Sequence, residues 1–334
     1  MTQKFDVKII CEIASAHCGN KDELYSIIDA AIDSGCNYLK FQIFSYKSLV
    51  HNNDVFPELK KIEFSNEEWN QAIEYSYKKI ELIIEPFDQL SLLNFLDDKR
   101  IFGIKIPTAD LSDTESLLKI IHSGKKVFAG VGGASLEEID DFMSYFTPLN
   151  MPILLHGFQS FPTRIEDSCL NKISELKTRY GCNVGYADHI DGASKLLAFS
   201  VPSAAILFGA EYIEKHITLK RSEKKYDYYS SLEPAEFIDF VEYIKLMNTT
   251  ANYKYDLKNL NPAEKEYRNK MKKFAVTKEY YPKGTNLLDI NLRYCRTAEP
   301  GLTGFDIRKM YDEDITLKVD ILQNSILKKE NFVG

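Results

Sequence analysis

Short apolar runs of four to eight residues recur along the first 250 residues, and each is followed by a turn and a segment whose apolar positions have helical spacing. Eight such runs are predicted as strands, at 7–13, 38–43, 82–85, 103–107, 126–130, 153–156, 182–189 and 210–216. Helices are predicted between and after them at 21–34, 67–79, 89–98, 113–122, 135–146, 166–179, 192–208 and 234–248. Several strands are apolar on both faces, which is typical of a parallel sheet covered by helices.

This alternation predicts an α/β fold of the (β/α)8 TIM-barrel type. Eight strand-and-helix units within about 250 residues match that architecture, whereas a doubly wound sheet normally stops earlier. A helix-start signal supports the register, because Asn20 precedes Asp22 and Glu23 and can cap the first predicted helix.

The pattern changes near residue 250. Residues 251–272 are polar and highly charged, with helical potential in their second half, and are predicted to be a linker. The barrel domain is therefore expected at 1–250 and a small, turn-rich domain at 273–334. A module of about 60 residues is too small to carry the chemistry alone.

Composition narrows the classes of partner. The chain has 49 acidic and 42 basic residues and a net charge of −7, which argues against binding to nucleic acid or to an anionic membrane surface. The first residues contain no apolar signal core, and no apolar run has the length of a membrane span, so a cytoplasmic protein is expected. The six cysteines form no CxxC pair and are expected to be reduced.

Polar residues are dense at the predicted strand ends, which is where barrels of this type carry their catalytic groups. They are Glu12, His17, Lys40, Gln42, Glu85, Lys105, Thr108, Asp110, His156, Gln159, Asp188, His189, Glu214, Lys215 and His216.

His189 and His216 each end an apolar run. A neutral imidazole on a rigid strand end is a good ligand for a divalent metal, so the two residues predict a shared metal site. The alternative is that each is a hydrogen-bonded core histidine.

Lys40 and Lys105 lie inside apolar strands. A buried lysine is costly unless it meets an anion, so the pair suggests a phosphate or carboxylate site. The turn GVGGAS at 130–135 could add backbone N–H groups at a helix start. The alternatives are that the lysines pair with Glu12 or Glu85, and that the turn is only a tight connection.

Several motifs then occur in a fixed order. They are EIASAHCGN (12–20), KFQ (40–42), EPFD (85–88), KIPTADL (105–111), LLH (154–156), FPT (161–163), GYADH (185–189) and IEKHITL (213–219). Together they resemble the sialic acid synthase family, also called N-acetylneuraminate synthases. The tail, with PKGT (282–285) and RTAEPGLTG (296–304), resembles that family's antifreeze-like (SAF, β-clip type) domain.

The resemblance implies a transferase that forms a carbon–carbon bond. It condenses phosphoenolpyruvate with an open-chain N-acetylated amino sugar or related aldose, giving a nonulosonic acid and phosphate for surface polysaccharide. His189 and His216 match the ligands of a divalent metal, Mn²⁺ or Mg²⁺, that polarises the sugar aldehyde. Lys40 and Lys105 match the lysines that hold phosphoenolpyruvate. Asp110 falls where the family has a glutamate that activates water.

The resemblance also assigns residues around the acceptor. Glu12 matches a carboxylate at the reacting end, and Asp227 matches a ligand of sugar hydroxyls. Arg296 matches an arginine that reaches the sugar site of a partner subunit, which implies a domain-swapped homodimer. The remaining substrate-binding predictions are Gln42, Thr108 and Gln159.

The chain departs from the family pattern at four places. Glu85 replaces the threonine of Thr-Pro-Phe, Gly130-Val131-Gly132 replaces Ser-Thr-Gly, Ala187 replaces the serine of Ser-Asp-His, and Gly157-Phe158-Gln159 replaces a Cys-Thr-(Asn/Ser) run. Several of the lost hydroxyls would donate to phosphoenolpyruvate, at roughly 1.5 to 3 kcal/mol each. Two alternatives follow: a metal-dependent aldolase or lyase with another donor, and a non-catalytic sugar-binding homologue.

Overall fold

The structure is a computed structural model that describes residues 6–52, 55–252, 259–311 and 314–333. The chain divides into two compact units, at 1–253 and 254–334, which are described separately. Among the described residues, no helix combines the length and the apolar character that a membrane span needs.

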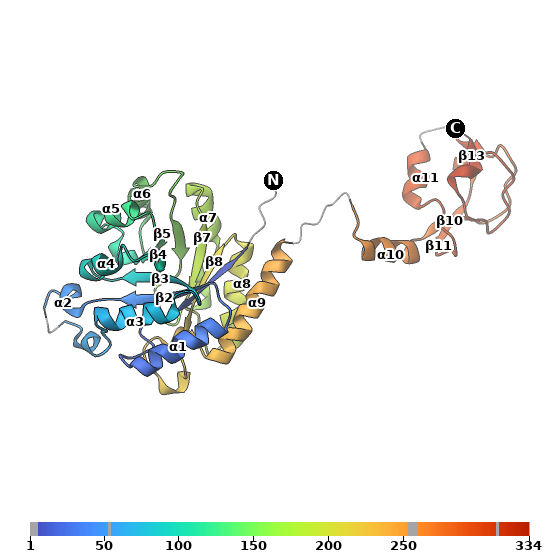
Figure 1. Cartoon of the computed structure of the whole chain (residues 1–334). Helices are drawn as coiled ribbons and strands as arrows, with labels where there is room; N and C mark the ends of the chain where they lie inside the picture. Colours follow the sequence, from blue (N-terminus) through green and yellow to red (C-terminus); the bar gives the residue numbers. More distant parts are fainter. Residues whose placement is uncertain (1–5, 53–54, 253–258, 312–313, 334) are drawn as a thin grey trace. The chain divides into compact units, whose positions relative to one another are not determined.

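The first unit is a closed parallel barrel with helices around its outside (Figure 1). The strands follow one another in chain order, and β1 pairs with β8 to close the ring. The strands are β1 (Lys8–Glu12), β2 (Tyr38–Ile43), β3 (Glu81–Pro86), β4 (Ile101–Ile106), β5 (Lys126–Gly130), β6 (Ile153–His156), β7 (Val184–Asp188) and β8 (Tyr212–Ile217), with a short β9 (Ser231–Leu232) beside β8. The predicted TIM barrel is confirmed.

Each connection between neighbouring strands contains at least one helix. The helices are α1 (Lys21–Asp33), α2 (Tyr46–Leu49), α3 (Asn66–Ser76), α4 (Gln89–Phe95), α5 (Thr114–His122), α6 (Leu136–Ser144), α7 (Asn171–Tyr180) and α8 (Lys195–Leu207), and α9 (Pro234–Asn252) follows the last strand. The prediction of a helix from residue 166 was wrong at its start. Residues Ile165–Ser168 form a 3-10 turn, and Cys169 has a left-handed backbone (φ 43°), so the α-helix begins only at Asn171.

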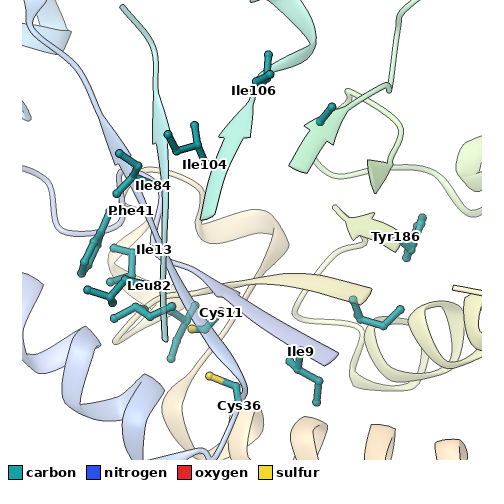
Figure 2. Packing of buried hydrophobic residues seen from close by; sticks show 14 of the residues in the cluster. Ile9, Cys11, Ile13, Cys36, Phe41, Leu82, Ile84, Ile104, Ile106 and Tyr186 are labelled. Atoms are coloured by element: carbon teal, nitrogen blue, oxygen red, sulfur yellow. The ribbon is translucent and has the colours of Figure 1, made fainter. Parts of the chain in front are cut away.

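Alternation along the strands separates two apolar layers. On β1 and just beyond it, Ile9, Cys11 and Ile13 belong to the core between strands and helices (Figure 2). Ile10 instead belongs to a cluster inside the barrel. Because successive side chains of a strand point to opposite faces, the next inward position after Ile10 is Glu12.

Aromatic side chains fill the lower part of the barrel interior. The ring of Phe128 lies 6.3 Å from that of Tyr38 and 5.5 Å from that of Tyr212, centroid to centroid. Two residues further along their strands, Tyr38 is followed by Lys40 and Tyr212 by Glu214. The aromatic layer therefore fills the interior below, and the polar residues form the next layer, at the C-terminal strand ends where the site lies.

The second unit has its own small core. It contains α10 (Pro262–Met271), β10 (Phe274–Thr277) paired with β11 (Leu292–Cys295), α11 (Gly304–Met310), and β12 (Thr316–Leu317) paired with β13 (Phe332–Val333). Its apolar cluster includes Ala275, Leu287, Ile307 and Leu327. Helix α10 occupies the second half of the predicted linker, and the first half includes residues 253–258, which lie outside the described residues. The antifreeze-like assignment stays a prediction.

Candidate functional site

The polar strand ends surround a cavity of about 410 Å³ at the mouth of the barrel. Eight of the predicted site residues line it: Glu12, Gln42, Lys105, Thr108, Gln159, His189, His216 and Asp227. The other lining residues include Glu85, Phe87, Gly130, Phe161, Ala187 and Glu214.

Three predicted site residues do not line this cavity. Lys40 is fully buried beside it. Asp110 lines a smaller cavity of about 80 Å³, which shares Lys105 with the larger one. Arg296 lies in the second unit, where its side chain is exposed.

Lys40 is the centre of a buried charge cluster. Its Nζ lies 2.6 Å from Glu85 Oε2 and 2.9 Å from Glu214 Oε1, and it also contacts Glu12 Oε2. None of these four side chains is more than 4% exposed. Such a cluster is tolerated only because each charge meets an opposite one.

Lys105 completes the cluster at the cavity wall. Its Nζ lies 2.8 Å from Glu214 Oε1 and 3.3 Å from Glu85 Oε1. Burial by itself would lower the pKa of Lys105, but the charges of Glu214 and Glu85 outweigh it and raise that pKa. The same lysines hold the pKa of Glu214 well below its usual range, against the effect of its burial. The alternative that the strand lysines pair with acidic residues is thus confirmed for both.

Two carboxylates also shape the loop after β1. Glu12 Oε1 accepts a hydrogen bond from the backbone N–H of Ala14 at 2.6 Å, and Asp227 Oδ2 accepts one from Ser15 at 3.0 Å. Burial raises the pKa of Asp227, and the Ser15 hydrogen bond only partly opposes that effect. Residues that are 212 positions apart therefore share one wall of the cavity.

His189 and His216 lie side by side, with ring centroids 5.3 Å apart. His189 Nδ1 donates to the carbonyl of Phe158 at 2.9 Å, which leaves the lone pair of the neutral ring on Nε2. Among the described residues, His216 Nδ1 is buried without a hydrogen-bond partner. Burial is the main cause that lowers the pKa of both rings, so both are neutral near pH 7.

This arrangement fits a metal better than it fits two core histidines. A ring whose N–H donates to a backbone carbonyl is the usual form of a metal-ligating histidine. A buried ring nitrogen without a partner is unfavourable unless a ligand meets it. In the part of the chain that the structure describes, no group of three or more His, Cys, Asp or Glu side chains surrounds one metal position. The chain therefore offers an ion two imidazoles rather than a closed cage.

Small residues line the wall formed by β5, β6 and β7. A Cβ at Gly130 would lie 3.1 Å from the hydroxyl oxygen of Thr108, and one at Gly157 would lie 2.5 Å from the carbonyl oxygen of Ala187. Thr108 Oγ1 is buried and has no hydrogen-bond partner among the described residues. Its hydroxyl is thus available to a ligand beside the place where the family pattern has a serine and this chain has Gly130.

The glycine turn at 130–135 leads into α6 through a capping box. Ser135 caps α6, accepting from the N–H of Glu138 at 3.2 Å, while Glu138 Oε2 accepts from the N–H of Ser135 at 2.7 Å. This capping box satisfies the N–H groups of Ser135 and Glu138. The suggestion that other N–H groups of the turn contribute to an anion site stays a prediction.

Asp110 has the strongest perturbation of any carboxyl group near the cavities that remains open to solvent. Burial, and then the charges of Asp113, Glu85 and Asp88, raise its pKa to about 6. Because this value exceeds the roughly 3.9 of an unfolded chain, ionised Asp110 opposes folding. This loss of folding stability grows as the pH rises from about 4 to 6 and is complete above 6.

Replacing Asp110 by asparagine is therefore expected to stabilise the protein at pH 7.5. After allowance for its partial exposure, the gain is about 1 kcal/mol, or a rise in melting temperature of about 2–4 °C, and it should vanish at pH 4. Thermal unfolding at both pH values measures it. Asp97→Asn, at an exposed position, is the control. A variant less stable than the parent at pH 7.5 would contradict the assigned pKa.

Glu214 was among the polar residues expected at the strand ends, but no role in the site was predicted for it. It accepts hydrogen bonds from both Lys40 and Lys105. The signal was present, since Glu214 lies two positions before His216 and residues two apart on a strand share a face. Lys215, between them, points the other way and binds Asp188 Oδ2 at 2.6 Å, next to His189. Asp188 is thus a buried ion-pair partner of Lys215.

Comparisons with known proteins identify the family of this chain. The NeuB family model matches residues 27–255. N,N'-diacetyllegionaminic acid synthase of Campylobacter jejuni is 26% identical over 310 residues, covering 87% of this chain and 90% of that protein. Human N-acetylneuraminate-9-phosphate synthase is 26% identical over 342 residues, covering 95% and 92%.

Solved structures match as well. The N-acetylneuraminic acid (sialic acid) synthetase of Leptospira borgpetersenii, in complex with citrate, is 31% identical with a TM-score of 0.70, covering 79% of this chain and 92% of that one. A spore coat polysaccharide biosynthesis protein E from Chromobacterium violaceum, 21% identical, shares the fold with a TM-score of 0.81 over 98% of this chain and 100% of its own. The chain therefore belongs to the NeuB family and is a sialic acid synthase-like transferase that forms a carbon–carbon bond.

Proposed function

We propose that this protein condenses phosphoenolpyruvate with an open-chain N-acetylated amino sugar or a related aldose, giving a nonulosonic acid and phosphate. The observation that carries the proposal is one cavity lined by two neighbouring neutral imidazoles and by an ammonium and four carboxylates at the barrel mouth. The relatives named as legionaminic acid and N-acetylneuraminate-9-phosphate synthases support this reaction class. The product would serve the biosynthesis of surface polysaccharide, and the proposed location of the protein is the cytoplasm.

The reaction joins C3 of phosphoenolpyruvate to the aldehyde carbon of the sugar. The aldehyde oxygen takes up a proton and becomes a hydroxyl group, water adds at C2, and the C2–O bond to phosphate breaks. A divalent ion, Mn²⁺ or Mg²⁺, held by His189 and His216 would polarise the aldehyde oxygen as a Lewis acid.

The chain's own residues bind and orient the two substrates. Lys105, at the cavity wall, attracts the anionic donor, and the available hydroxyl of Thr108 can donate to it. Gln42 and Gln159 line the same cavity and can hydrogen-bond to either substrate. Glu12 and Asp227, on the opposite wall, can accept hydrogen bonds from sugar hydroxyls.

Asp110 is the proposed base for the water that adds at C2. A carboxyl group with a pKa of about 6 is mostly ionised at neutral pH, so it can accept a proton from water there and return it. The cavity lined by Asp110 adjoins the main cavity, because Lys105 lines both of them. A water between the two cavities would be within reach of Asp110 and of a donor in the main cavity. The rate should therefore fall as the pH drops through about 6.

The second unit is proposed to be an antifreeze-like domain that acts on a partner subunit. Arg296 directly follows β11 and is exposed, which suits a side chain that contributes to the sugar site of a second copy. The proposed assembly is a domain-swapped homodimer.

The test is phosphate release from phosphoenolpyruvate by the full chain. Purified protein is mixed with Mn²⁺ or Mg²⁺ and a panel of N-acetylated hexosamines, their 6-phosphates and diacetamido sugars. We expect phosphate release and a product with the mass of the sugar plus pyruvate, and both should require the ion and one of the sugars. Activity that persists in excess chelator would contradict the metal, and absence of release with every acceptor would contradict the reaction.

Glu85 and Ala187 favour one other function, a metal-dependent aldolase or lyase whose donor carries no phosphate. With pyruvate as donor, C3 loses a proton to a base and bonds to the aldehyde carbon, whose oxygen is protonated; nothing leaves. Turnover of pyruvate with the same sugars, without any turnover of phosphoenolpyruvate, would establish this function instead. A non-catalytic sugar-binding role would be indicated by absence of metal binding in calorimetry.

A further inference from the structure

Glu85 lies between the two lysines of the site. Its Oε2 is 2.6 Å from Lys40 Nζ and 3.3 Å from Gln42 Nε2, and its Oε1 is 3.3 Å from Lys105 Nζ. The residue is 3% exposed and is in the last inward-facing layer of β3, opposite Gln42 on β2. One carboxylate thus bridges both ammonium groups, as a bound anion would.

The charges of Lys40 and Lys105 would be neutralised even without Glu85. Lys105 also meets Glu214, and Lys40 also meets both Glu214 and Glu12. Glu12 and Glu214 alone would balance the two lysines, so Glu85 makes the cluster one charge more negative than neutral. An anionic ligand that approaches Lys105 therefore meets a site whose positive charge is already compensated.

The hydroxyl groups around this point are few. Gly130 and Ala187 line the cavity without a polar side-chain atom, and Thr108 alone offers a buried hydroxyl that lacks a partner among the described residues. The cavity is therefore poor in hydroxyl donors that could offset the repulsion between the Glu85 carboxylate and a phosphate.

We propose that Glu85 is a specificity-determining residue of the donor subsite. Its carboxylate occupies the place between Lys40 and Lys105 that an anionic group of the donor would otherwise take, and it weakens the binding of a multiply charged donor relative to a singly charged one. This inference rests on the proposed function, because that function places the donor at Lys40 and Lys105. It predicts that removal of the Glu85 charge strengthens the binding of phosphoenolpyruvate.

The experiment measures the binding of phosphoenolpyruvate to the full chain by calorimetry. Glu85→Gln, which keeps the size and removes the charge, should lower the Kd about tenfold or more, as expected when a repelling charge is removed and one charge-assisted hydrogen bond is gained. The KM for phosphoenolpyruvate should fall by a similar factor. The control is Glu81→Gln, the same change of charge at the exposed first residue of β3, which should leave the Kd within about twofold.

Further measurements guard against a misfolded variant. Circular dichroism checks the fold, and Glu85→Thr is a second variant that also removes the charge. The parent protein gives an independent result, since it should bind phosphoenolpyruvate no more tightly than pyruvate despite the extra phosphate. A parent that prefers phosphoenolpyruvate more than about 100-fold would overturn the inference.

The outcomes separate this inference from the proposed function. Phosphate release by the parent together with an unchanged or higher Kd in Glu85→Gln overturns the inference alone. Phosphate release by Glu85→Gln but not by the parent supports the inference and contradicts the proposed function. Absence of phosphoenolpyruvate binding in the parent and in both Glu85 variants overturns both.

Discussion

Replacing His216 by alanine is expected to reduce the rate of condensation on the order of 1000-fold or more. The proposed ion supplies several kcal/mol of charge stabilisation at the aldehyde oxygen, and each 1.36 kcal/mol is a factor of ten in rate. His189→Ala should have a similar effect, because the two rings lie 5.3 Å apart and line the same cavity. Steady-state phosphate release measures the loss.

Metal binding provides a second measurement for the same variants. Addition of Mn²⁺ should raise the melting temperature of the parent, since a ligand that binds only the folded state stabilises it. Mn²⁺ should leave the melting temperature of His216→Ala unchanged. The control is His122→Ala on the exposed side of α5, which should keep both the activity and the shift. Full activity in either strand-end variant would show that the pair is structural.

Replacing Lys40 by methionine is expected to destabilise the barrel by about 3–5 kcal/mol. The substitution leaves Glu12, Glu85 and Glu214 buried around the former ammonium position, with only Lys105 to offset their charge. Thermal unfolding of a domain of this size should shift by about 2–4 °C per kcal/mol, so a fall of roughly 10 °C is expected. Lys47→Met, at an exposed position of α2, should change it little.

A double variant tests whether charge balance is the cause. Glu85→Gln in the Lys40→Met background removes one of the stranded carboxylates and should restore part of the lost stability, a coupling that unrelated sites would not show. If the two effects simply add, the ion pairs contribute little and Lys40 matters through its packing. An increase in stability with Lys40→Met alone would mean that desolvation of the cluster outweighs its mutual attraction.

The fold and the general position of the site could be predicted from the sequence for the same reason. Apolar alternation and helical spacing are local properties, and eight repeated units leave few architectures that bury them all. Once the barrel was predicted, residues such as His189 and Lys105 had to lie at its C-terminal rim, because parallel strands end at the same edge. The start of α7 was missed because a left-handed residue, Cys169, interrupts a helical pattern without altering its periodicity.

The internal chemistry of the site was decided only by the tertiary structure. Two hypotheses for Lys40 and Lys105 were compatible with the sequence: an anion site, or ion pairs with acidic residues. Nothing in the sequence distinguished between them. The choice depends on distances of about 3 Å between atoms on β2, β3, β4 and β8, which closure of the barrel sets. In the same way, Glu214 became a shared partner of both lysines, and Asp110 came to line a separate cavity.

The sequence by itself therefore determined a (β/α)8 barrel with a polar, histidine-bearing mouth, because that information lies in short-range periodicity and in the order of motifs. Only the tertiary structure decided that Glu85 bridges the two lysines and that His216 has a buried nitrogen without a partner among the described residues. The physical reason is that the energy of a charge or of a polar atom depends on its neighbours in space, and those neighbours come from strands far apart in the chain.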